Sequence, residues 1–278
     1  MALSPAVFVA RRFDPRSIPG LESWWDAADA ASVTLDSGRV SQLSDKSGRG
    51  RHAANTTSGS TQPSYITAGR NGLNVARFDA ASVQRLTVAS STAAYNFIHN
   101  GTESYIAAVS VYGTVANPNA IYGLLGSSRG SLPTGFQVVY RDNSPANDAL
   151  TCDIANNGTA VANGLNAGNT AVLTAHFNLA PAQTMLVQEC AIDADNATAS
   201  QRVKVRVNGG TEVAENNKTA AVTTGNAEQN LQLGAVGNNV SPLQGDICEI
   251  LIYSQIPIAA ARDMIRRYLA AKWGVTLA

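Results

Sequence analysis

The sequence predicts an all-β protein built as an antiparallel β-sandwich, and three observations lead to this prediction. Charged residues make up only 14% of the 278-residue chain, against about 25% in an ordinary soluble domain. Ser, Thr, Asn and Gly are abundant instead, and they favour turns and sheet surfaces over long helices. Many short apolar segments are separated by turn residues with almost no helix between them, which favours a sandwich over a parallel α/β sheet.

Residues 1–17 are predicted to form an extended arm, because they contain Pro5 and Pro15 and show no helical period. Residues 18–278 are expected to form one domain, since sandwiches of this size commonly remain single. We expect the arm to anchor the protein to partner chains, and its candidate contact residues are Phe8, Arg11, Arg12, Phe13 and Arg16. The alternative is that these charges are solvated in a tail.

Strands are predicted where apolar runs are bounded by Gly, Asn, Asp, Ser or Pro. The clearest segments are 73–78, 105–112, 135–140, 171–177, 184–192, 202–207, 231–233 and 247–253. In the segment 202–207, Val203, Val205 and Val207 alternate with charged residues, which predicts one buried and one solvated face. The Asn-Gly-Gly sequence at 208–210 predicts a tight turn after this strand.

One segment near the C-terminus, 258–272, has the period of an amphipathic α-helix. Apolar side chains recur there at spacings of three and four residues: Ile258, Ala261, Ile265, Tyr268 and Leu269. Lys272 suits the negative end of the helix dipole, and Gly274 can adopt the left-handed conformation that ends a helix. The helix is expected to pack on the sandwich, with pairing to another subunit as the alternative.

Motifs at the two ends of the chain carry a family resemblance. Near the N-terminus they are WWDAAD at 24–29 and SDKSGRG at 44–50, and near the C-terminus GDICEILIYS at 245–254 and YLAAKWG at 268–274. Together they resemble the concanavalin A-like, laminin-G-type jelly rolls of bacteriophage virion proteins and bacterial surface proteins, over roughly residues 20–278. Leu43 and Ala80 depart from the pattern, because many relatives have Trp and Gly there. The resemblance implies a fold but leaves function open.

Charge and hydropathy exclude several classes of partner. Twenty basic residues balance twenty acidic ones, whereas a protein that binds a nucleic-acid duplex usually has a basic surface. No run of about 18 apolar residues is present, so no membrane-spanning helix is expected. The N-terminal segment lacks the pattern of a secretory signal peptide, since its arginines follow a short apolar stretch instead of preceding it.

Buried polar groups are expected to be structural. Cys152, Cys190 and Cys248 lie far apart with no CxxC pair, and we expect them to be buried thiols. Glu249 lies in an apolar strand and therefore needs a partner. An arginine in the segment 262–267 is the expected one.

Catalysis is not expected. A glycoside hydrolase on this fold needs paired carboxylates, about 5 Å apart in retaining enzymes. Asp246 and Glu249 have an odd spacing, which predicts opposite faces of a strand. Glu189, Asp193 and Asp195 share a face only if their strand continues, and the sequence after residue 192 is typical of a turn. No nucleophile elbow, zinc spacing, phosphate-binding loop or dinucleotide-binding motif is present.

A polar loop is the candidate ligand site, because Asp, Asn and carbonyl oxygens suit both Ca²⁺ and sugar hydroxyls. An aromatic ring beside it is a suitable stacking surface for a sugar. The candidate residues are Tyr140, Asp142, Asn143, Asn147 and Asp148. Ca²⁺ is the one cofactor considered, and an ordinary polar turn is the alternative.

The first functional hypothesis, which the resemblance implies, is a non-catalytic structural or receptor-facing protein of a bacteriophage virion. It would be present as a homo-oligomer or in many copies, in a capsid decoration or a tail or fibre component. The alternative is a carbohydrate-binding adhesin module of a bacterial surface protein. A glycan hydrolase is the second alternative.

Overall fold

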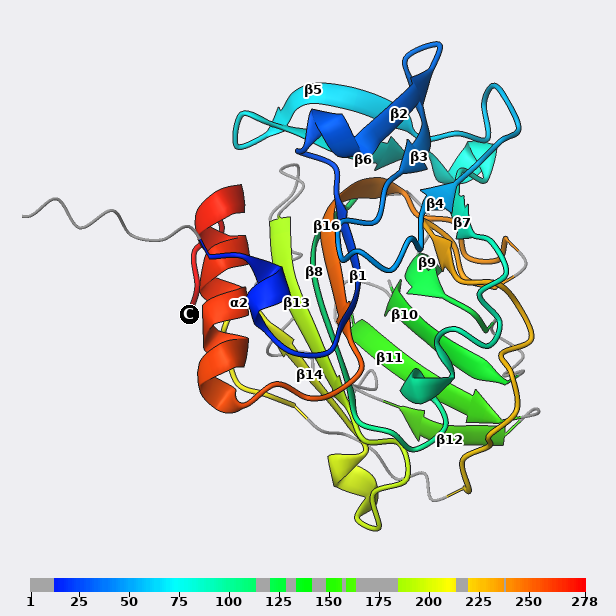
Figure 1. Cartoon of the computed structure of the whole chain (residues 1–278), viewed down its shortest axis with the longest axis vertical. Helices are drawn as coiled ribbons and strands as arrows, with labels where there is room; N and C mark the ends of the chain where they lie inside the picture. The colour runs from blue at the N-terminus through cyan, green and yellow to red at the C-terminus, as the bar shows by residue number, and fades with distance from the viewer. Residues whose placement is uncertain are drawn as a thin grey trace, which may run out of the picture.

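The computed structural model describes residues 13–113, 121–128, 134–141, 149–156, 159–163, 185–213, 220–237 and 239–278. Within them the chain forms three layers (Figure 1): two antiparallel sheets face each other, and one helix covers the outer side of the first sheet. This arrangement confirms the predicted all-β sandwich with a single C-terminal helix.

The sheet beneath the helix is centred on the long strand β16. Its members, in spatial order, are β6 (Leu73–Phe78), β16 (Gly245–Tyr253), β8 (Ser104–Tyr112), β13 (Met185–Ile192) and β14 (Val203–Val207). β8 pairs along one edge of β16, whereas β6 and β1 (Leu21–Asp26) pair with successive halves of the other edge. β16 therefore joins segments from both ends of the chain.

The opposite sheet contains shorter strands. In spatial order they are β12 (Thr159–Asn163), β11 (Ala149–Asn156), β10 (Gly135–Arg141), β9 (Ile121–Gly126), β15 (Gln232–Leu233), β7 (Leu86–Val88) and β4 (Ala53–Ala54). β3 (Arg39–Leu43) and β5 (Ser64–Arg70) connect this sheet to β6, and β2 (Val33–Asp36) pairs with β3. Short 3₁₀ turns are η1 (Pro15–Ser17), η2 (Ala30–Ser32), η3 (Ala80–Ser82), η4 (Asn96–Ile98) and η5 (Ala199–Gln201).

The first sheet is apolar on both faces, which creates two cores. In β8, Ile106 and Ala108 point into the core between the sheets, whereas Tyr105 and Ala107 point toward the helix. Adjacent residues of a strand point to opposite faces, so one strand serves both cores. The thiols of Cys152, Cys190 and Cys248 are buried and free, as the sequence predicts.

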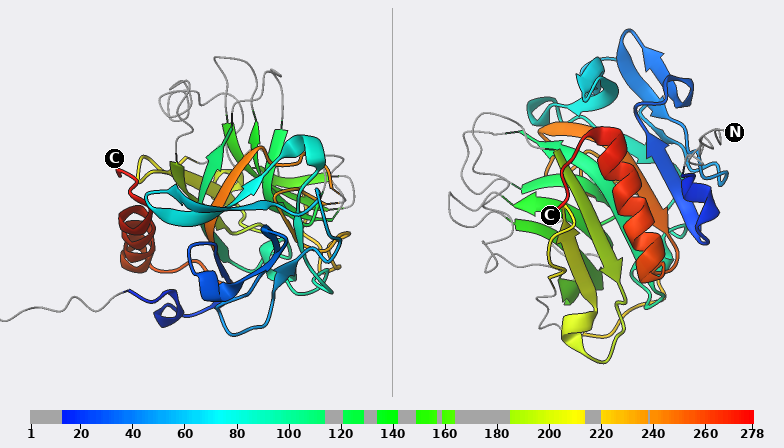
Figure 2. Two further views of the ribbon diagram at one scale, coloured as in Figure 1. Left: turned by 90° about the horizontal axis from the view of Figure 1, so that it is seen from above. Right: turned by 90° about the vertical axis from the view of Figure 1, so that its left-hand side faces the viewer.

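The C-terminal helix α2 (Ala259–Trp273) lies across the outer face of this sheet (Figure 2). Ile265, Leu269 and Trp273 are each 0% exposed against the sheet. Gly274 ends the helix in the left-handed conformation with φ +70°, as the sequence predicts. No helix in the described part of the chain is long and apolar enough to span a membrane.

The last residues of the predicted arm pack on their own domain. The ring of Phe13 lies 5.2 Å from that of Tyr268 on α2, and the carbonyl of Pro15 accepts a 3.3 Å hydrogen bond from the Tyr253 hydroxyl. Arg16 is exposed and forms an ion pair with Asp14. Residues 13–17 therefore contact the sandwich, whereas Phe8, Arg11 and Arg12 lie outside the described residues.

The predicted hairpin around β14 is confirmed. Asn208 and Gly209 both have left-handed backbone, with φ +48° and φ +74°, and the Gly210 amide donates to the Val207 carbonyl at 3.0 Å. Two consecutive positive φ angles define a type I′ turn. The predicted strand 171–177 lies outside the described residues.

Candidate functional site

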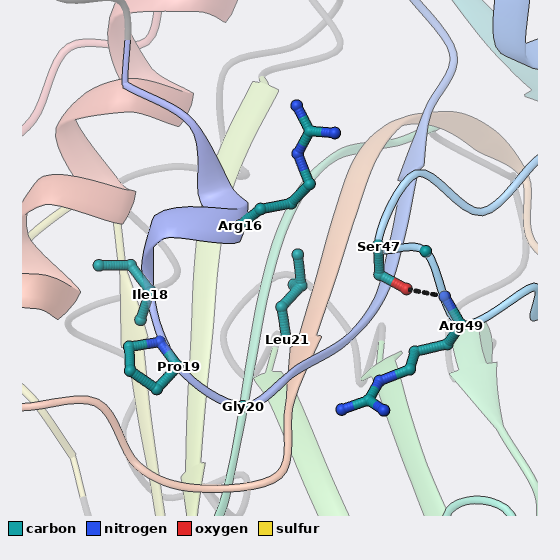
Figure 3. A pocket seen from close by; sticks show the side chains of 8 residues that line it. Arg16, Ile18, Pro19, Gly20, Leu21, Ser47 and Arg49 are labelled. Carbon is teal, nitrogen blue, oxygen red and sulfur yellow. Dashed lines mark hydrogen bonds between the residues drawn. The ribbon is translucent and has the colours of Figure 1, made fainter.

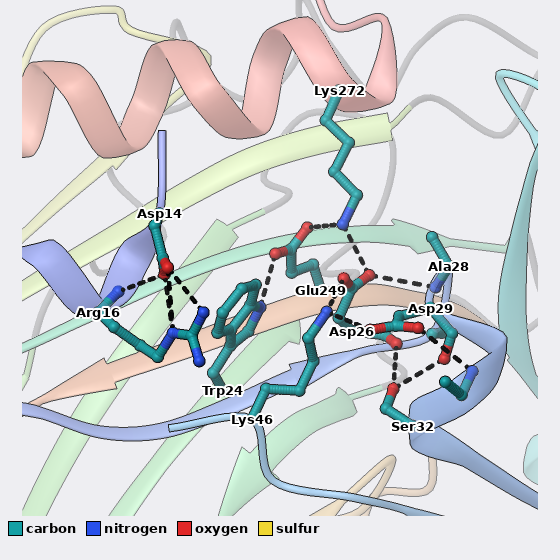
Figure 4. A network of polar contacts seen from close by, with 12 residues as sticks. Asp14, Arg16, Trp24, Asp26, Ala28, Asp29, Ser32, Lys46, Glu249 and Lys272 are labelled. Atoms are coloured by element: carbon teal, nitrogen blue, oxygen red, sulfur yellow. Dashed lines mark hydrogen bonds and ion pairs between the residues drawn. The ribbon is translucent and has the colours of Figure 1, made fainter. Parts of the chain in front are cut away.

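The motifs at the two ends of the chain meet around one buried carboxylate, Glu249 (Figure 4). Its oxygens accept hydrogen bonds from Trp24 Nε1 at 2.8 Å and Trp273 Nε1 at 2.9 Å. Tyr268 Oη and Lys272 Nζ donate to it at 2.8 Å and 2.7 Å. We call these five residues, together with Asp26, the Glu249 cluster.

Asp26 extends this cluster toward the surface. It lies opposite Glu249 in the β1–β16 pairing, and Lys272 Nζ bridges the two carboxylates, 2.7 Å from each. Lys46 binds Asp26 at 2.8 Å and Asp29 at 2.6 Å. Burial, followed by the negative charge of Asp26, raises the pKa of Glu249, whereas Lys272 opposes this shift.

The cation beside Glu249 is Lys272, so the expected arginine partner is wrong. Lys272, in the last turn of α2, lies over β16 and binds Glu249. Arg266 points to β13 instead, and its Nε lies 2.5 Å from Glu189 Oε2. Tyr105 donates a further hydrogen bond to Glu189. Both buried glutamates are therefore held by cations and hydroxyls of surrounding elements.

Asp246 and Glu249 lie on the same face of β16, which corrects the prediction of opposite faces. The register with β8 shifts between Ile247 and Glu249, and such a bulge changes the alternation of side chains. Asp246 is bound by Arg77 at 2.7 Å and by Arg70 at 2.8 Å. Asp246 and Glu249 therefore have separate cationic partners.

The second sheet carries a row of polar side chains that we call the polar ladder: Gln137, Arg141, Thr151 and Asp153. Asp153 accepts from Gln137 Nε2 at 2.8 Å and from Arg141 Nη2 at 3.0 Å, and Arg141 Nε lies 3.3 Å from Thr151 Oγ1. Their neighbours in sequence, such as Val138 and Cys152, point into the core between the sheets. Gln137, Thr151 and Asp153 are buried, whereas the Arg141 side chain is 29% exposed, so Arg141 is the member of the ladder that reaches the surface.

The polar ladder lies at the end of the strand that leads into the predicted ligand loop. Arg141 is the last residue of β10, and the loop residues Asp142, Asn143, Asn147 and Asp148 lie outside the described residues. Tyr140 was expected to present its ring to a sugar. Instead this ring is 5% exposed and lies 4.8 Å from the ring of Tyr112 within the core.

Sequence reasoning missed the polar ladder, although a signal was present. Residues 136–141 alternate Phe, Val and Tyr with Gln, Val and Arg, and β11 carries Thr151 and Asp153 between apolar residues. The alternation identifies outward positions, but only the strand register places Gln137 directly opposite Asp153. Among the residues that the structure describes, no group of three or more His, Cys, Asp or Glu side chains could hold a metal ion.

A second candidate surface is a hollow of about 340 Å³ where the N-terminal segment meets the turn after β3 (Figure 3). We call it the basic hollow, and its lining residues are Arg16, Ile18, Pro19, Gly20, Leu21, Ser47, Gly48 and Arg49. The turn on one side is held by the Asp45 carboxylate, which accepts from the amides of Trp24, Ser47 and Arg51 at 2.9 Å, 2.9 Å and 3.0 Å. The Asp45 carboxylate therefore fixes the shape of this turn.

His99 is buried, and one ring nitrogen lacks a partner. The side chain is 1% exposed, its Nε2 lies 3.0 Å from the Gly225 carbonyl, and Nδ1 has no hydrogen-bond partner within the described residues. Burial lowers the pKa of His99, and the hydrogen bond to Gly225 opposes this shift. The neutral imidazole is therefore the form that the folded protein favours.

This burial predicts a loss of stability in mild acid. The folded-state pKa of His99 lies below the unfolded value of about 6.5, so the unfolded chain takes up the proton first as pH falls. The free energy of unfolding should decline below that pH by at most about 1.4 kcal/mol per pH unit from this residue. Urea unfolding from pH 7.5 to 5.0 measures it, and His99→Gln should reduce the slope. An unchanged slope would show that His99 does not contribute.

The described chain is thus a two-sheet β-sandwich with a helix-covered sheet, and its buried carboxylates are engaged by protein donors. No family model matches the sequence, and no curated protein matches it. Solved structures match its fold. An arabinofuranosidase complexed with arabinofuranosyl-α-1,2-xylobiose has a TM-score of 0.54 and 15% identity, over 84% of this chain and 51% of that one.

Two further structures extend this comparison. The binding domain of Paraclostridial Mosquitocidal Protein 1 gives a TM-score of 0.52 at 10% identity, over 90% of this chain and 52% of that one. The CBM40 module of the Ruminococcus gnavus IT-sialidase, bound to α2,3-sialyllactose, gives 0.41 at 14% identity, over 62% of this chain and 85% of that one. The chain therefore spans about half the length of the arabinofuranosidase and of the mosquitocidal-protein binding domain. The likeness to these two structures shows the fold alone.

Proposed function

We propose that this chain is a non-catalytic carbohydrate-binding module, and that its glycan surface is formed by Arg141, the exposed member of the polar ladder, together with the adjoining loop 142–148. The observation that carries the proposal is this guanidinium, whose side chain is 29% exposed. Asp153, which is 5% exposed, accepts hydrogen bonds from Arg141 Nη2 at 3.0 Å and from Gln137 Nε2 at 2.8 Å, so the buried ladder residues orient the guanidinium. A planar guanidinium matches the paired hydroxyls of a sugar, because it presents adjacent N–H donors.

Two further observations support this proposal. The fold is shared with an arabinofuranosidase that was solved with a bound saccharide, so a glycan is the ligand class that we carry over to this chain. The buried carboxylates Asp26, Asp153, Glu189, Asp246 and Glu249 each contact a lysine or arginine. A general acid needs a proton that it can release, which such pairing disfavours.

The test is a glycan array followed by calorimetric titration of the best ligand. Arg141→Lys keeps the charge but loses the planar fork, so we expect affinity to fall at least about tenfold, equivalent to about 1.4 kcal/mol. Asn147→Ala in the loop is expected to act in the same direction. Arg267→Lys is the matched control, because Arg267 is 73% exposed on the far side of α2.

Two outcomes would overturn this function. The first is an array with no bound glycan. The second is unchanged affinity in both Arg141→Lys and Asn147→Ala, which would remove the polar ladder and the loop from the binding surface. The thermal unfolding midpoint of each variant is measured in parallel, so that loss of binding is separated from loss of folding.

The biological setting is a separate proposal. The sequence resemblance supports display of this module on a bacteriophage particle, in a homo-oligomer or in many copies, with a bacterial cell surface as the alternative. Mass spectrometry of purified particles tests it, since stoichiometric copies support the virion setting. Absence from every particle would favour the cell surface.

A further inference from the structure

The basic hollow has the composition of a site for an anion. Arg16 and Arg49 come from separate segments and lie on either side of Leu21 (Figure 3). Their side chains are 61% and 56% exposed. A planar guanidinium binds a carboxylate or sulfate through two parallel hydrogen bonds, so two such groups around one hollow favour an oxyanion.

Both arginines form ion pairs with carboxylates of their own chain, and a ligand anion has to replace these carboxylates. Arg16 binds Asp14, whose side chain is 43% exposed. Arg49 lies 3.3 Å from Glu22, but Arg51 occupies the other oxygen of the same carboxylate at 2.9 Å. Ion pairs at this level of exposure contribute little. The long Arg49–Glu22 contact can therefore be exchanged for a ligand anion at little cost, whereas an anion at Arg16 must replace three side-chain hydrogen bonds to Asp14 of 2.7–3.1 Å.

The rest of the lining is suited to a sugar ring. Ile18, Pro19 and Leu21 contribute apolar atoms to the lining between the two arginines, although Ile18 and Leu21 are themselves largely buried. A Cβ at Gly48 would meet nothing within 4 Å, so the space beside this turn is open. An apolar surface contacts the C–H face of a sugar while polar groups at the edge bind its substituents.

We infer that the basic hollow is a second binding site, separate from the polar ladder, for a sugar that carries an oxyanion, either a carboxylate or a sulfate ester. The two sites lie on different sheets: the hollow is beside β1, and the ladder is on β10 and β11. This inference does not depend on the ladder. The ligand of the basic hollow carries a carboxylate or a sulfate ester, which a neutral glycan lacks.

The experiment uses one sugar backbone in three forms. The probes are a chondroitin sulfate hexasaccharide, its desulfated form, which retains the carboxylates, and a desulfated, carboxyl-reduced form with no charge. Calorimetric titration compares the wild-type chain with the double variant Arg16→Gln/Arg49→Gln. Arg267→Gln makes a charge change of the same kind at an exposed helix position and serves as the control.

We expect a charged hexasaccharide to bind and the neutral one to bind at least tenfold more weakly. The double variant should lose at least tenfold in affinity for the charged probe, whereas Arg267→Gln should bind like the wild type. Binding that survives desulfation assigns the carboxylate as the anion, and binding that desulfation abolishes assigns the sulfate.

Equal binding of the charged and neutral forms, or unchanged affinity in the double variant, would overturn the inference. Loss of binding in Arg141→Lys but not in the double variant would also overturn it, while leaving the proposed function intact. Because both arginines are exposed, the variants are expected to fold. The NMR signals of their Nε–Hε groups report directly whether each guanidinium meets the probe.

Discussion

The variant Glu249→Ala is expected to lose about 3–5 kcal/mol of unfolding free energy. Removal of this carboxylate leaves Lys272 with Asp26 as its remaining anionic partner, and leaves the indole N–H groups of Trp24 and Trp273 without an acceptor. A buried donor without a partner costs about 1–3 kcal/mol, and Glu249 itself is 0% exposed. Domains are stable by only about 5–15 kcal/mol, so we expect a large fall in the urea midpoint.

Two companion variants separate the causes of this loss. Glu103→Ala removes an exposed carboxylate and should change stability by less than about 0.5 kcal/mol. Glu249→Leu combined with Lys272→Met removes the buried pair together, which is often much less damaging than removal of one partner. A loss below about 1 kcal/mol in Glu249→Ala would contradict the structural role of the Glu249 cluster.

Among the glycines that the structure describes, Gly245 is the one whose substitution by alanine is expected to be most disruptive. A Cβ at this position would lie 1.9 Å from the carbonyl oxygen of Val111 and 2.9 Å from its carbon. Gly245 begins β16 between Tyr112 of β8 and Phe78 of β6, so neither side can move without breaking a strand pair. Its φ of +151° is also unfavourable for other residues. We expect a loss above about 4 kcal/mol, the range of exceptional substitutions.

Gly38→Ala is the matched control for Gly245→Ala. Gly38 also has a positive φ, +80°, but a Cβ there would meet nothing within 4 Å. Its substitution should cost only the backbone strain, about 1–2 kcal/mol. Thermal unfolding of the two variants measures the difference, and equal losses would show that strain rather than the close approach of β8 determines the need for glycine.

Much of the fold is predictable because it depends on local periodicity. The alternation in 203–207 and the spacing of Ile265 and Leu269 in α2 each follow from the geometry of one element. The turn at Asn208 follows from the intrinsic preferences of Asn and Gly. These features do not require knowledge of distant residues, so the sequence predicts them nearly as the structure has them.

The candidate sites depend on register and bulges, which the sequence does not reveal. The shift in β16 places Asp246 on the same face as Glu249, against simple alternation. The partner of Glu249 is Lys272 because the helix crosses β16 at that residue, whereas Arg266 lies over β13. Tyr140 is buried because it alternates with Arg141, so the outward residue of the pair is the arginine.

The central place of β16 has a consequence for synthesis on the ribosome. Trp24 and Glu249 are 225 residues apart, so β1, β6 and β8 emerge long before the strand that joins them. Until residues 245–253 leave the exit tunnel, these strands keep open edges and an uncovered apolar face, which are features of aggregation-prone intermediates. Because distant pairings close slowly, we expect the nascent chain to depend on chaperones until β16 emerges, and a ribosome stalled before β16 should hold a protease-sensitive chain.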